Sequence, residues 1–162
     1  LGVTEDSALF LHNVVEQLDA LPTDAAGWDA LATEVVTARR AEGKFVPGLG
    51  HPVHNDGDPR TPRLFELAHE HGTFGPHLEL YAAIGRVHPN VLGKTLPLNG
   101  AGVCGAVLAD LDLPFGIMRG FALLARCAGL LGQLAEEMAD PIANEIYMNV
   151  DRNTDYQPTR HD

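Results

Sequence analysis

The sequence has few cysteines and few cationic residues. Only Cys104 and Cys127 occur among 162 residues, and both stand in apolar surroundings. Two buried cytosolic thiols are therefore a simpler interpretation than a disulfide or a reactive site. Eleven lysines and arginines stand against 22 aspartates and glutamates, which gives a net charge of -11. This charge disfavours nucleic acids and anionic membranes as general partners.

The sequence also lacks strand-like alternation, internal repeats, low-complexity segments and Asn-x-Ser/Thr sites. Hydrophobic residues make up 45% of the chain and charged residues 20%, which is typical of one folded globular domain. The sequence does not open on a recognisable signal peptide, and its first residue is Leu1 rather than an initiator Met. We therefore expect a cytoplasmic protein, and we expect this chain to be part of a longer one.

Hydrophobic periodicity predicts an all-α fold. Loops rich in Gly and Pro separate the helical segments, and residues 44–59 form the longest of these loops. The tail, residues 149–162, is polar and is expected to wrap a neighbour or to remain loose. Helices are predicted from about Thr4 to Leu21, Asp24 to Gly43, Thr61 to Gly72, Pro76 to His88, Asn99 to Leu111 and Pro114 to Ala139.

The last predicted helix is apolar almost all round over residues 121–135, so we expect it to be central and buried. Arg126 interrupts this stretch, and Arg119 and Glu136-Glu137 bound it, so the segment is too short and too charged for a bilayer. An arginine in such a helix requires a partner. That partner is either a distant carboxylate of the protein or a carboxylate of a ligand.

The segment Pro47-Gly48-Leu49-Gly50-His51 places a histidine on a glycine-flanked turn, and Asp58-Pro59-Arg60 follows it. Glycines allow a backbone to approach a ligand closely. An imidazole held on such a turn donates a hydrogen bond to a carbonyl, and a nearby guanidinium grips a carboxylate with two parallel bonds. These groups suit a 2-oxo acid.

The order of several motifs resembles the C-terminal part of the citrate synthase superfamily, and most closely its short citryl-CoA lyase-like members. The motifs are Pro47-Gly48-x-Gly50-His51, Asp58-Pro59-Arg60, Leu96-Pro97-Leu98-Asn99, Leu124-Ala125-Arg126-x-Ala128-Gly129-Leu130 and Glu136-Glu137. The resemblance implies an all-α fold with a small domain and adjoining helices of a large domain. It assigns residues 1–43 to the end of the large-domain segment, residues 44–139 to a small-domain-like region and residues 140–162 to a C-terminal tail.

The resemblance also implies an activity. Members of this family make or break a C–C bond between an acyl-CoA and a 2-oxo acid such as acetyl-CoA and oxaloacetate, as transferases or lyases. The resemblance implies a homodimer or a complex with an N-terminal portion, coenzyme A as a co-substrate, and neither a permanently bound cofactor nor a metal. It makes His51 the catalytic residue, which polarises the oxo group. It assigns substrate binding to His51, Arg60, Arg126 and Asn99, and coenzyme A binding to His54, Asn55 and Lys94.

The sequence departs from the family pattern at three places. Ala101 stands where the catalytic aspartate of citrate synthases is expected, and alanine cannot move a proton. The His-Gly-Gly motif that carries a second catalytic histidine is absent. The loop after His51 reads Asn55-Asp56-Gly57, without the basic residues that meet coenzyme A phosphates. We favour an enzyme of the citryl-CoA lyase type. The alternative is a non-catalytic relative that binds a dicarboxylate or serves in assembly.

Overall fold

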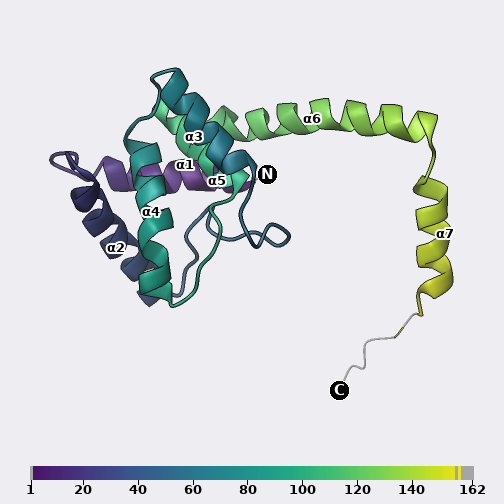
Figure 1. Ribbon diagram of the computed structural model, residues 1–162, viewed down its shortest axis with the longest axis horizontal. Helices are drawn as coiled ribbons and strands as arrows, with labels where there is room; N and C mark the ends of the chain where they lie inside the picture. The colour runs from purple at the N-terminus through teal and green to yellow at the C-terminus, as the bar shows by residue number, and fades with distance from the viewer. Residues whose placement is uncertain (1, 156, 158–162) are drawn as a thin grey trace. The chain divides into compact units, whose positions relative to one another are not determined.

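A computed structural model describes residues 2–155 and residue 157. The prediction of an all-α protein is confirmed, because the described residues form seven helices and no strand (Figure 1). One isolated antiparallel bridge joins Leu49 to Leu98. The helices are α1 (Gly2–Val15), α2 (Ala25–Ala41), α3 (Arg60–Glu70), α4 (Pro76–Leu92), α5 (Gly100–Asp110), α6 (Phe115–Ala139) and α7 (Ala143–Asn153).

The chain divides into two compact units, Leu1–Leu123 and Leu124–Asp162. In the first unit, α4 packs against α2 and α5, and α5 also packs against α1 and α3. The core of this unit is built from fully buried side chains such as Leu80, Tyr81 and Ile84 of α4. This core is continuous with the segments that carry the Gly48–His51 loop. The three-segment division made from the sequence remains a prediction.

Capping side chains define the beginnings of three helices. Asp24 and Asn99, predicted as helix starts, accept hydrogen bonds from the backbone N–H of Gly27 (2.8 Å) and Gly102 (2.9 Å). The start of α4 has no local cap. There, Asp110 at the end of α5 accepts backbone hydrogen bonds from Gly75, His77 and Leu78. A carboxylate distant in sequence therefore satisfies the first turn of α4.

The predicted end of the fourth helix at His88-Pro89 is wrong by one turn. Helix α4 continues through Pro89 to Leu92 and ends at Gly93, which adopts a left-handed conformation with φ of 69°. Pro89 begins the last turn, so it removes one intrahelical hydrogen bond and interrupts no following turn. Its carbonyl still accepts a hydrogen bond from the Gly93 N–H (2.9 Å).

The sequence analysis missed α7, because residues 140–162 were assigned to a tail. The segment carries Ile142, Ile146 and Val150 at helical spacing, but its remaining residues are polar. Both carboxylate oxygens of Glu137 accept backbone hydrogen bonds at the start of this helix, from Ile142 (3.1 Å) and Ala143 (3.0 Å). These bonds lower the pKa of Glu137. A side chain of α6 therefore caps α7, and this interaction was not visible as a local motif.

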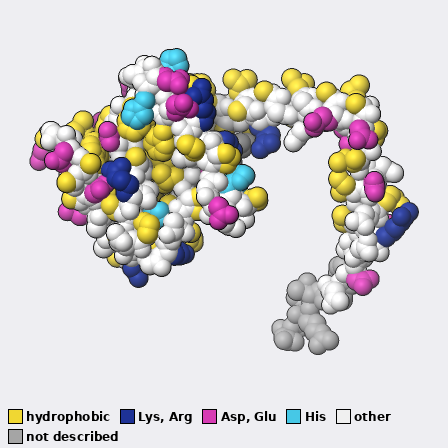
Figure 2. Space-filling model, viewed as in Figure 1, with side chains coloured by type: hydrophobic (Ala, Val, Ile, Leu, Met, Phe, Trp, Pro, Cys, Tyr) yellow, Lys and Arg dark blue, Asp and Glu magenta, His cyan; other side chains and the backbone are white. Residues whose placement is uncertain are grey.

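The expectation that the last long helix is buried is also wrong for this chain. Within α6 only Met118 is buried, and large apolar side chains such as Leu124 (70% exposed) and Leu131 (71% exposed) face solvent. Cys127, expected to be buried, is exposed as well. Figure 2 shows the resulting hydrophobic side chains along α6 and α7. Apolar composition predicts that a helix will be covered, but it does not say which segment or chain covers it.

Helix α6 is also long and apolar enough to cross a membrane, by length and composition alone. A single helix of this kind is weak evidence for a membrane span, because buried core helices of soluble proteins pass the same test. Charged residues occur at Arg126 within the helix and at Glu136-Glu137 near its end. That this helix packs against protein stays a prediction.

Candidate functional site

Two loops of the first unit are joined into one framework at the beginning of α5. The Gly50 N–H donates to the Pro97 carbonyl (2.7 Å), and the Asn99 N–H donates to the Gly48 carbonyl (2.9 Å). The buried Tyr81 hydroxyl also donates to the Gly48 carbonyl (2.7 Å), and burial raises the pKa of this phenol. The core helix α4 therefore fixes the position of the glycine-rich loop.

Gly48 is required at its position for two reasons. Its φ of 86° lies in the left-handed region, which disfavours other residues. A Cβ at this position would also lie 2.7 Å from the Cα of Gly102 and 2.8 Å from the Tyr81 hydroxyl. The absence of a side chain lets the loop approach α5, so the residues that follow Gly48 are presented beside the first turn of that helix.

Asn99 joins the loop to the helix through its side-chain amide. Its Oδ1 caps α5 at the Gly102 N–H, and its Nδ2 donates to the Gly50 carbonyl (2.8 Å). Asn99 was predicted to bind substrate. The structure shows that it positions Gly50, the residue before His51, and its substrate contact stays a prediction.

His51 is half-buried, and its ring is held by backbone groups of its own loop. Nδ1 accepts hydrogen bonds from the N–H of Val53 (3.0 Å) and of His54 (2.9 Å). A nitrogen that accepts two such bonds carries no proton, so the neutral ring carries its proton on Nε2. Nε2 has no hydrogen-bond partner among the described residues. His51 Nε2 is therefore the ring nitrogen open to a ligand, and the role of His51 in polarising an oxo group stays a prediction.

Arg60 is held by Asp58 through two parallel hydrogen bonds. Asp58 is only 3% exposed, and its two oxygens accept from Arg60 Nε (2.9 Å) and Nη2 (2.6 Å). The same carboxylate accepts the backbone N–H of Arg60 (3.1 Å) and of Gly100 (2.6 Å). These hydrogen bonds, that to the Arg60 side chain above all, hold the pKa of Asp58 far below its usual range. Asp58 thereby links the Arg60 guanidinium to the start of α5.

The Arg60 side chain keeps part of its binding capacity. It is 56% exposed, and Nη1 has no partner among the residues that the structure describes. A guanidinium has five N–H groups, and the pair with Asp58 uses those on Nε and Nη2. Gly100 lies directly beside it, since a Cβ there would be 2.5 Å from Arg60 Nε. The exposed side of the guanidinium is thus available to an external carboxylate.

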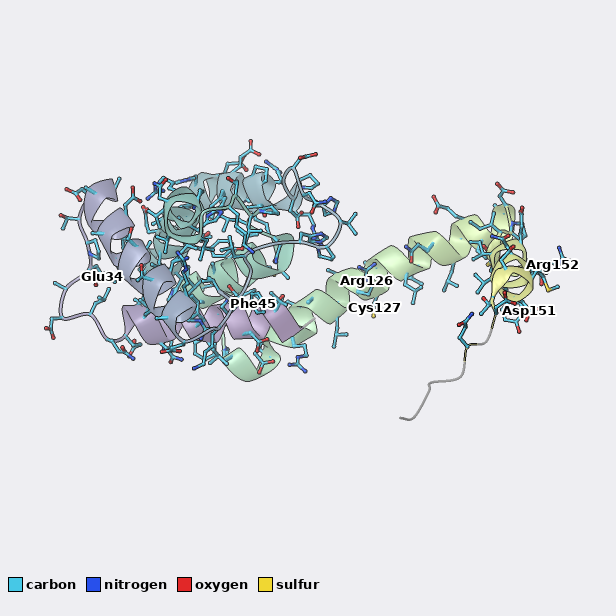
Figure 3. The ribbon with its side chains drawn as sticks, turned by 90° about the horizontal axis from the view of Figure 1, so that it is seen from below. Glu34, Phe45, Arg126, Cys127, Asp151 and Arg152 are labelled. Carbon is cyan, nitrogen blue, oxygen red and sulfur yellow. The ribbon has the colours of Figure 1, made fainter. Side chains whose placement is uncertain are left out.

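Arg126 does not have the environment expected from the sequence. It is exposed on α6, in the unit Leu124–Asp162, and it has no ion-pair partner among the described residues (Figure 3). Arg126 is therefore not buried as expected, and the described residues do not supply the expected ion pair to a distant carboxylate. A role in holding a second substrate carboxylate remains a prediction.

The residues predicted to contact coenzyme A fall into two places. His54 and Asn55 lie on the loop after His51, with the His54 ring 4.5 Å from the His51 ring. Lys94 lies at a cavity of about 210 Å³ together with Arg39, Arg40 and Lys44. The sequence analysis missed these last three cations. They could have been recognised in the sequence, because they stand shortly before the glycine-rich loop.

The cations at this cavity are partly used within the protein. The Arg39 guanidinium donates to the Phe45 carbonyl and lies 5.1 Å from the Phe10 ring centroid. Arg40 donates to the Val91 carbonyl, and Lys44 pairs with Glu42 at 2.9 Å. This pair lowers the pKa of Glu42. In a chain with 22 acidic residues, four cations around one cavity form a local concentration of positive charge.

A larger cleft of about 730 Å³ is lined by the same loop. Its lining includes Pro47, Gly48, Leu49, Gly50 and Asn99, together with residues of α1. The α1 residues are Val3, Asp6, Leu9, Phe10 and Asn13. Phe45, at the edge of both cavities, is 89% exposed (Figure 3).

Comparison with known proteins agrees with this architecture. Residues 10–147 match the family model described as citrate synthase, C-terminal domain. The chain belongs to the citrate synthase family. A solved structure, citryl-CoA lyase from Hydrogenobacter thermophilus, is similar with a TM-score of 0.75 and 23% sequence identity. The similarity to that structure bears on the fold. No curated protein sequence matches the chain.

The matched lengths differ between the two proteins. The similarity covers 99% of this chain and 59% of the citryl-CoA lyase chain. This citrate synthase-family chain therefore spans about three fifths of the length of the solved structure that it resembles.

Proposed function

We propose that this citrate synthase-family chain carries the 2-oxo acid site of an enzyme that breaks or forms a C–C bond between an acyl-CoA and a 2-oxo dicarboxylate. Cleavage of the citryl-CoA lyase type is the leading reaction, with oxaloacetate and acetyl-CoA as the type of products. The observation that carries the proposal is the pairing of a donor tautomer at His51 with a guanidinium held by Asp58. Both are joined to the start of α5.

His51 supplies an electrophilic contact in this proposal. Its Nε2–H donates to the oxo oxygen, and this bond strengthens as negative charge develops on that oxygen. Backbone donors to Nδ1 keep the ring in the donor tautomer before substrate arrives. The geometry is therefore preorganised for stabilising an alkoxide.

Arg60 supplies the carboxylate contact. Its exposed N–H groups bind one carboxylate of the dicarboxylate, and Asp58 holds the guanidinium plane in one orientation. Asn99 positions the loop beside the oxo group, and the role of Arg126 toward a second carboxylate stays a prediction from the family resemblance. A carboxylate fixed by Arg60 orients the electrophile toward the incoming or leaving carbanion.

Coenzyme A binds as a co-substrate beside the glycine-rich loop. Its phosphates match the cations at Arg39, Arg40, Lys44 and Lys94, with His54 and Asn55 as further contacts. The exposed Phe45 ring offers a flat apolar surface to a base. These features support a nucleotide-bearing thioester in a chain of otherwise negative charge.

The exposed apolar faces of α6 and α7 support an assembly. We propose that a second copy of the chain or an N-terminal portion covers them in a cytoplasmic protein. Exposed side chains such as Leu124, Leu131 and Tyr147 form too large an apolar surface for a stable monomer. Light scattering of the purified protein tests the first of these, and a mass equal to the single 162-residue chain contradicts a second copy as the covering partner.

Calorimetric titration with oxaloacetate tests the 2-oxo acid site. The unchanged protein is expected to show saturable binding, and Arg60→Ala is expected to remove it. Arg63→Ala is the matched control, since Arg63 is an exposed arginine that pairs with Glu66 on the outer surface of α3. Equal binding by the Arg60→Ala variant and the control contradicts the assignment of Arg60.

Turnover is tested separately by adding citryl-CoA and measuring acetyl-CoA and oxaloacetate. The second candidate function is a dicarboxylate-binding relative without catalysis, which Ala101 favours because its methyl group cannot move a proton. That candidate predicts binding of oxaloacetate without turnover. Release of acetyl-CoA that depends on His51 contradicts it.

A further inference from the structure

A reaction at the α-carbon of an acyl thioester needs a group that removes or returns a proton at that carbon. Ala101, half-buried in the first turn of α5, offers none. Asp58 is the carboxylate closest to Arg60, but both of its oxygens accept hydrogen bonds and its pKa lies far below the usual range. The proton-transfer group is therefore not among these residues.

The lining of the large cleft includes another carboxylate. Asp6 is the acidic side chain among the described residues that line this cleft, which Gly50 and Asn99 also line. It is exposed, and it has no hydrogen-bond or ion-pair partner within the described part of the chain. The neighbouring Glu5, in contrast, pairs with Arg119 at 3.3 Å. Asp6 is thus a carboxylate free to accept a proton.

Close packing between α1 and α5 brings Asp6 near the start of α5. Ser7, the next residue, is buried and donates from Oγ to the Gly102 carbonyl (3.2 Å). Gly105 lacks a side chain where the Thr4 carbonyl crosses it, which lets the two helices approach. The first two turns of α1 therefore lie against the turn that contains Ala101.

We propose that Asp6 is the catalytic residue that exchanges the proton at the α-carbon of the acyl-CoA, in place of a carboxylate at Ala101. This assignment rests on the proposed function. Asp6 then takes the place of an acidic residue on α5 from a different helix, α1. A thioester in this cleft lies beside Asp6 and beside Gly50, the residue that precedes His51.

The proposed step is balanced without a further reactant. In condensation, Asp6 takes one proton from the α-carbon, and the C–H electron pair forms the new C–C bond to the oxo carbon. The carbonyl electron pair moves to oxygen, where His51 Nε2–H stabilises the alkoxide. Water protonates the alkoxide, and protonated Asp6 returns its proton to the resulting hydroxide. In cleavage the same steps run backwards, and Asp6 delivers the proton to the enolate carbon.

Hydrogen–deuterium exchange at the acetyl-CoA methyl group tests the assignment directly. The full-length protein is incubated in D2O with acetyl-CoA and oxaloacetate, and mass spectrometry follows deuterium in acetyl-CoA and in the condensation product. Asp6→Asn is expected to slow exchange and citryl-CoA cleavage by about 100-fold or more, while Asp6→Glu keeps a measurable part of the rate. Oxaloacetate binding is expected to remain within about twofold, because Asp6 acts on the other substrate.

Asp19→Asn is the matched control, since Asp19 is exposed in the loop after α1 and its substitution changes the charge by the same amount. An Asp6→Asn rate within about threefold of this control overturns the role of Asp6, while the proposed function stands. Absence of exchange and turnover in the unchanged protein overturns both. Melting temperatures equal to that of the unchanged protein show that a lost rate is not lost folding.

Discussion

The start of α5 and the middle of α6 differ in how their side chains are satisfied. At α5, the carboxylate of Asp58, the amide of Asn99 and the hydroxyl of Tyr81 all have partners, and most of those partners are backbone groups of another segment. Along α6, Leu124 and Leu131 remain largely exposed. The loops around His51 and Arg60 are thus held by contacts within the first unit, whereas the apolar side chains of α6 have no such contacts among the described residues.

Asp58→Ala is expected to have the largest effect on the α5 side of this comparison. It leaves the buried Gly100 N–H without an acceptor and releases the Arg60 guanidinium, so we expect a loss of about 3 kcal/mol in the free energy of unfolding. Urea unfolding measures this loss. A loss below about 1 kcal/mol would show that water replaces the carboxylate and that the start of α5 is less dependent on Asp58 than described.

The pH dependence of stability follows from the same residue. Folding lowers the pKa of Asp58, so the ionised carboxylate stabilises the folded state. This contribution to the free energy of unfolding is present above the pKa that Asp58 has in the unfolded chain, about 4, and is lost as the pH falls toward its pKa in the folded chain. Asp58→Asn is therefore expected to lose less stability than the unchanged protein between pH 5 and pH 3, as measured by urea unfolding. Parallel pH curves for the two proteins would contradict this prediction.

Gly48→Ala is expected to have the next largest effect, because the new Cβ meets both Gly102 and Tyr81. We expect a loss of about 2 to 3 kcal/mol in the free energy of unfolding, from overpacking and from the positive φ. Gly72→Ala is the control, because Gly72 also has a positive φ (64°) but has open space at its Cβ. Its expected loss is about 1 kcal/mol. Equal losses of stability in Gly48→Ala and Gly72→Ala would show that the positive φ alone, without the close packing, explains why Gly48 is a glycine.

Asn99→Ala is expected to cost about 1 to 2 kcal/mol, because it removes the cap of α5 and the bond to the Gly50 carbonyl. Asn99→Asp keeps the capping oxygen and removes only the donor to Gly50. If Asn99 positions the loop, both variants weaken oxaloacetate binding in calorimetry, and only Asn99→Ala loses the cap. Unchanged oxaloacetate binding by Asn99→Asp would show that the bond to the Gly50 carbonyl is not needed for binding, so that Asn99 acts only as the cap of α5.

Leu131→Gln on α6 is expected to have the smallest effect on the unfolding of the separate chain, within about 0.5 kcal/mol, since the side chain is already 71% exposed. The same change is expected to weaken assembly, measured by light scattering across protein concentrations. A large loss of stability in a demonstrated monomer would show that α6 is covered by its own chain, and the comparison above would then fail.

The site was predictable from the sequence in its residue types, and less so in its contacts. His51, Arg60 and Asn99 are recognisable because glycines, a capping position and a short spacing surround them. The contacts that hold them include the bond from the Gly100 N–H to Asp58, the partner of Arg60, and the bond from Asn99 to the Gly50 carbonyl, which join residues 42 and 49 positions apart in the chain. Arg39, Arg40 and Asp6 were not predicted as site residues. Each lies on the polar face of a helix, and helical periodicity does not distinguish a polar residue at a cavity from one that faces open solvent.

The sequence by itself determined the helical class, the caps at Asp24 and Asn99 and the loop that presents His51. These features depend on interactions between residues within one or two turns, so a local pattern reports them. Only the tertiary structure decided the contact between Asp58 and Gly100, the cleft that Asp6 shares with Gly50 and the exposure of α6. Those features depend on which segments meet, and packing between helices is set by the whole arrangement of apolar surfaces rather than by neighbouring residues.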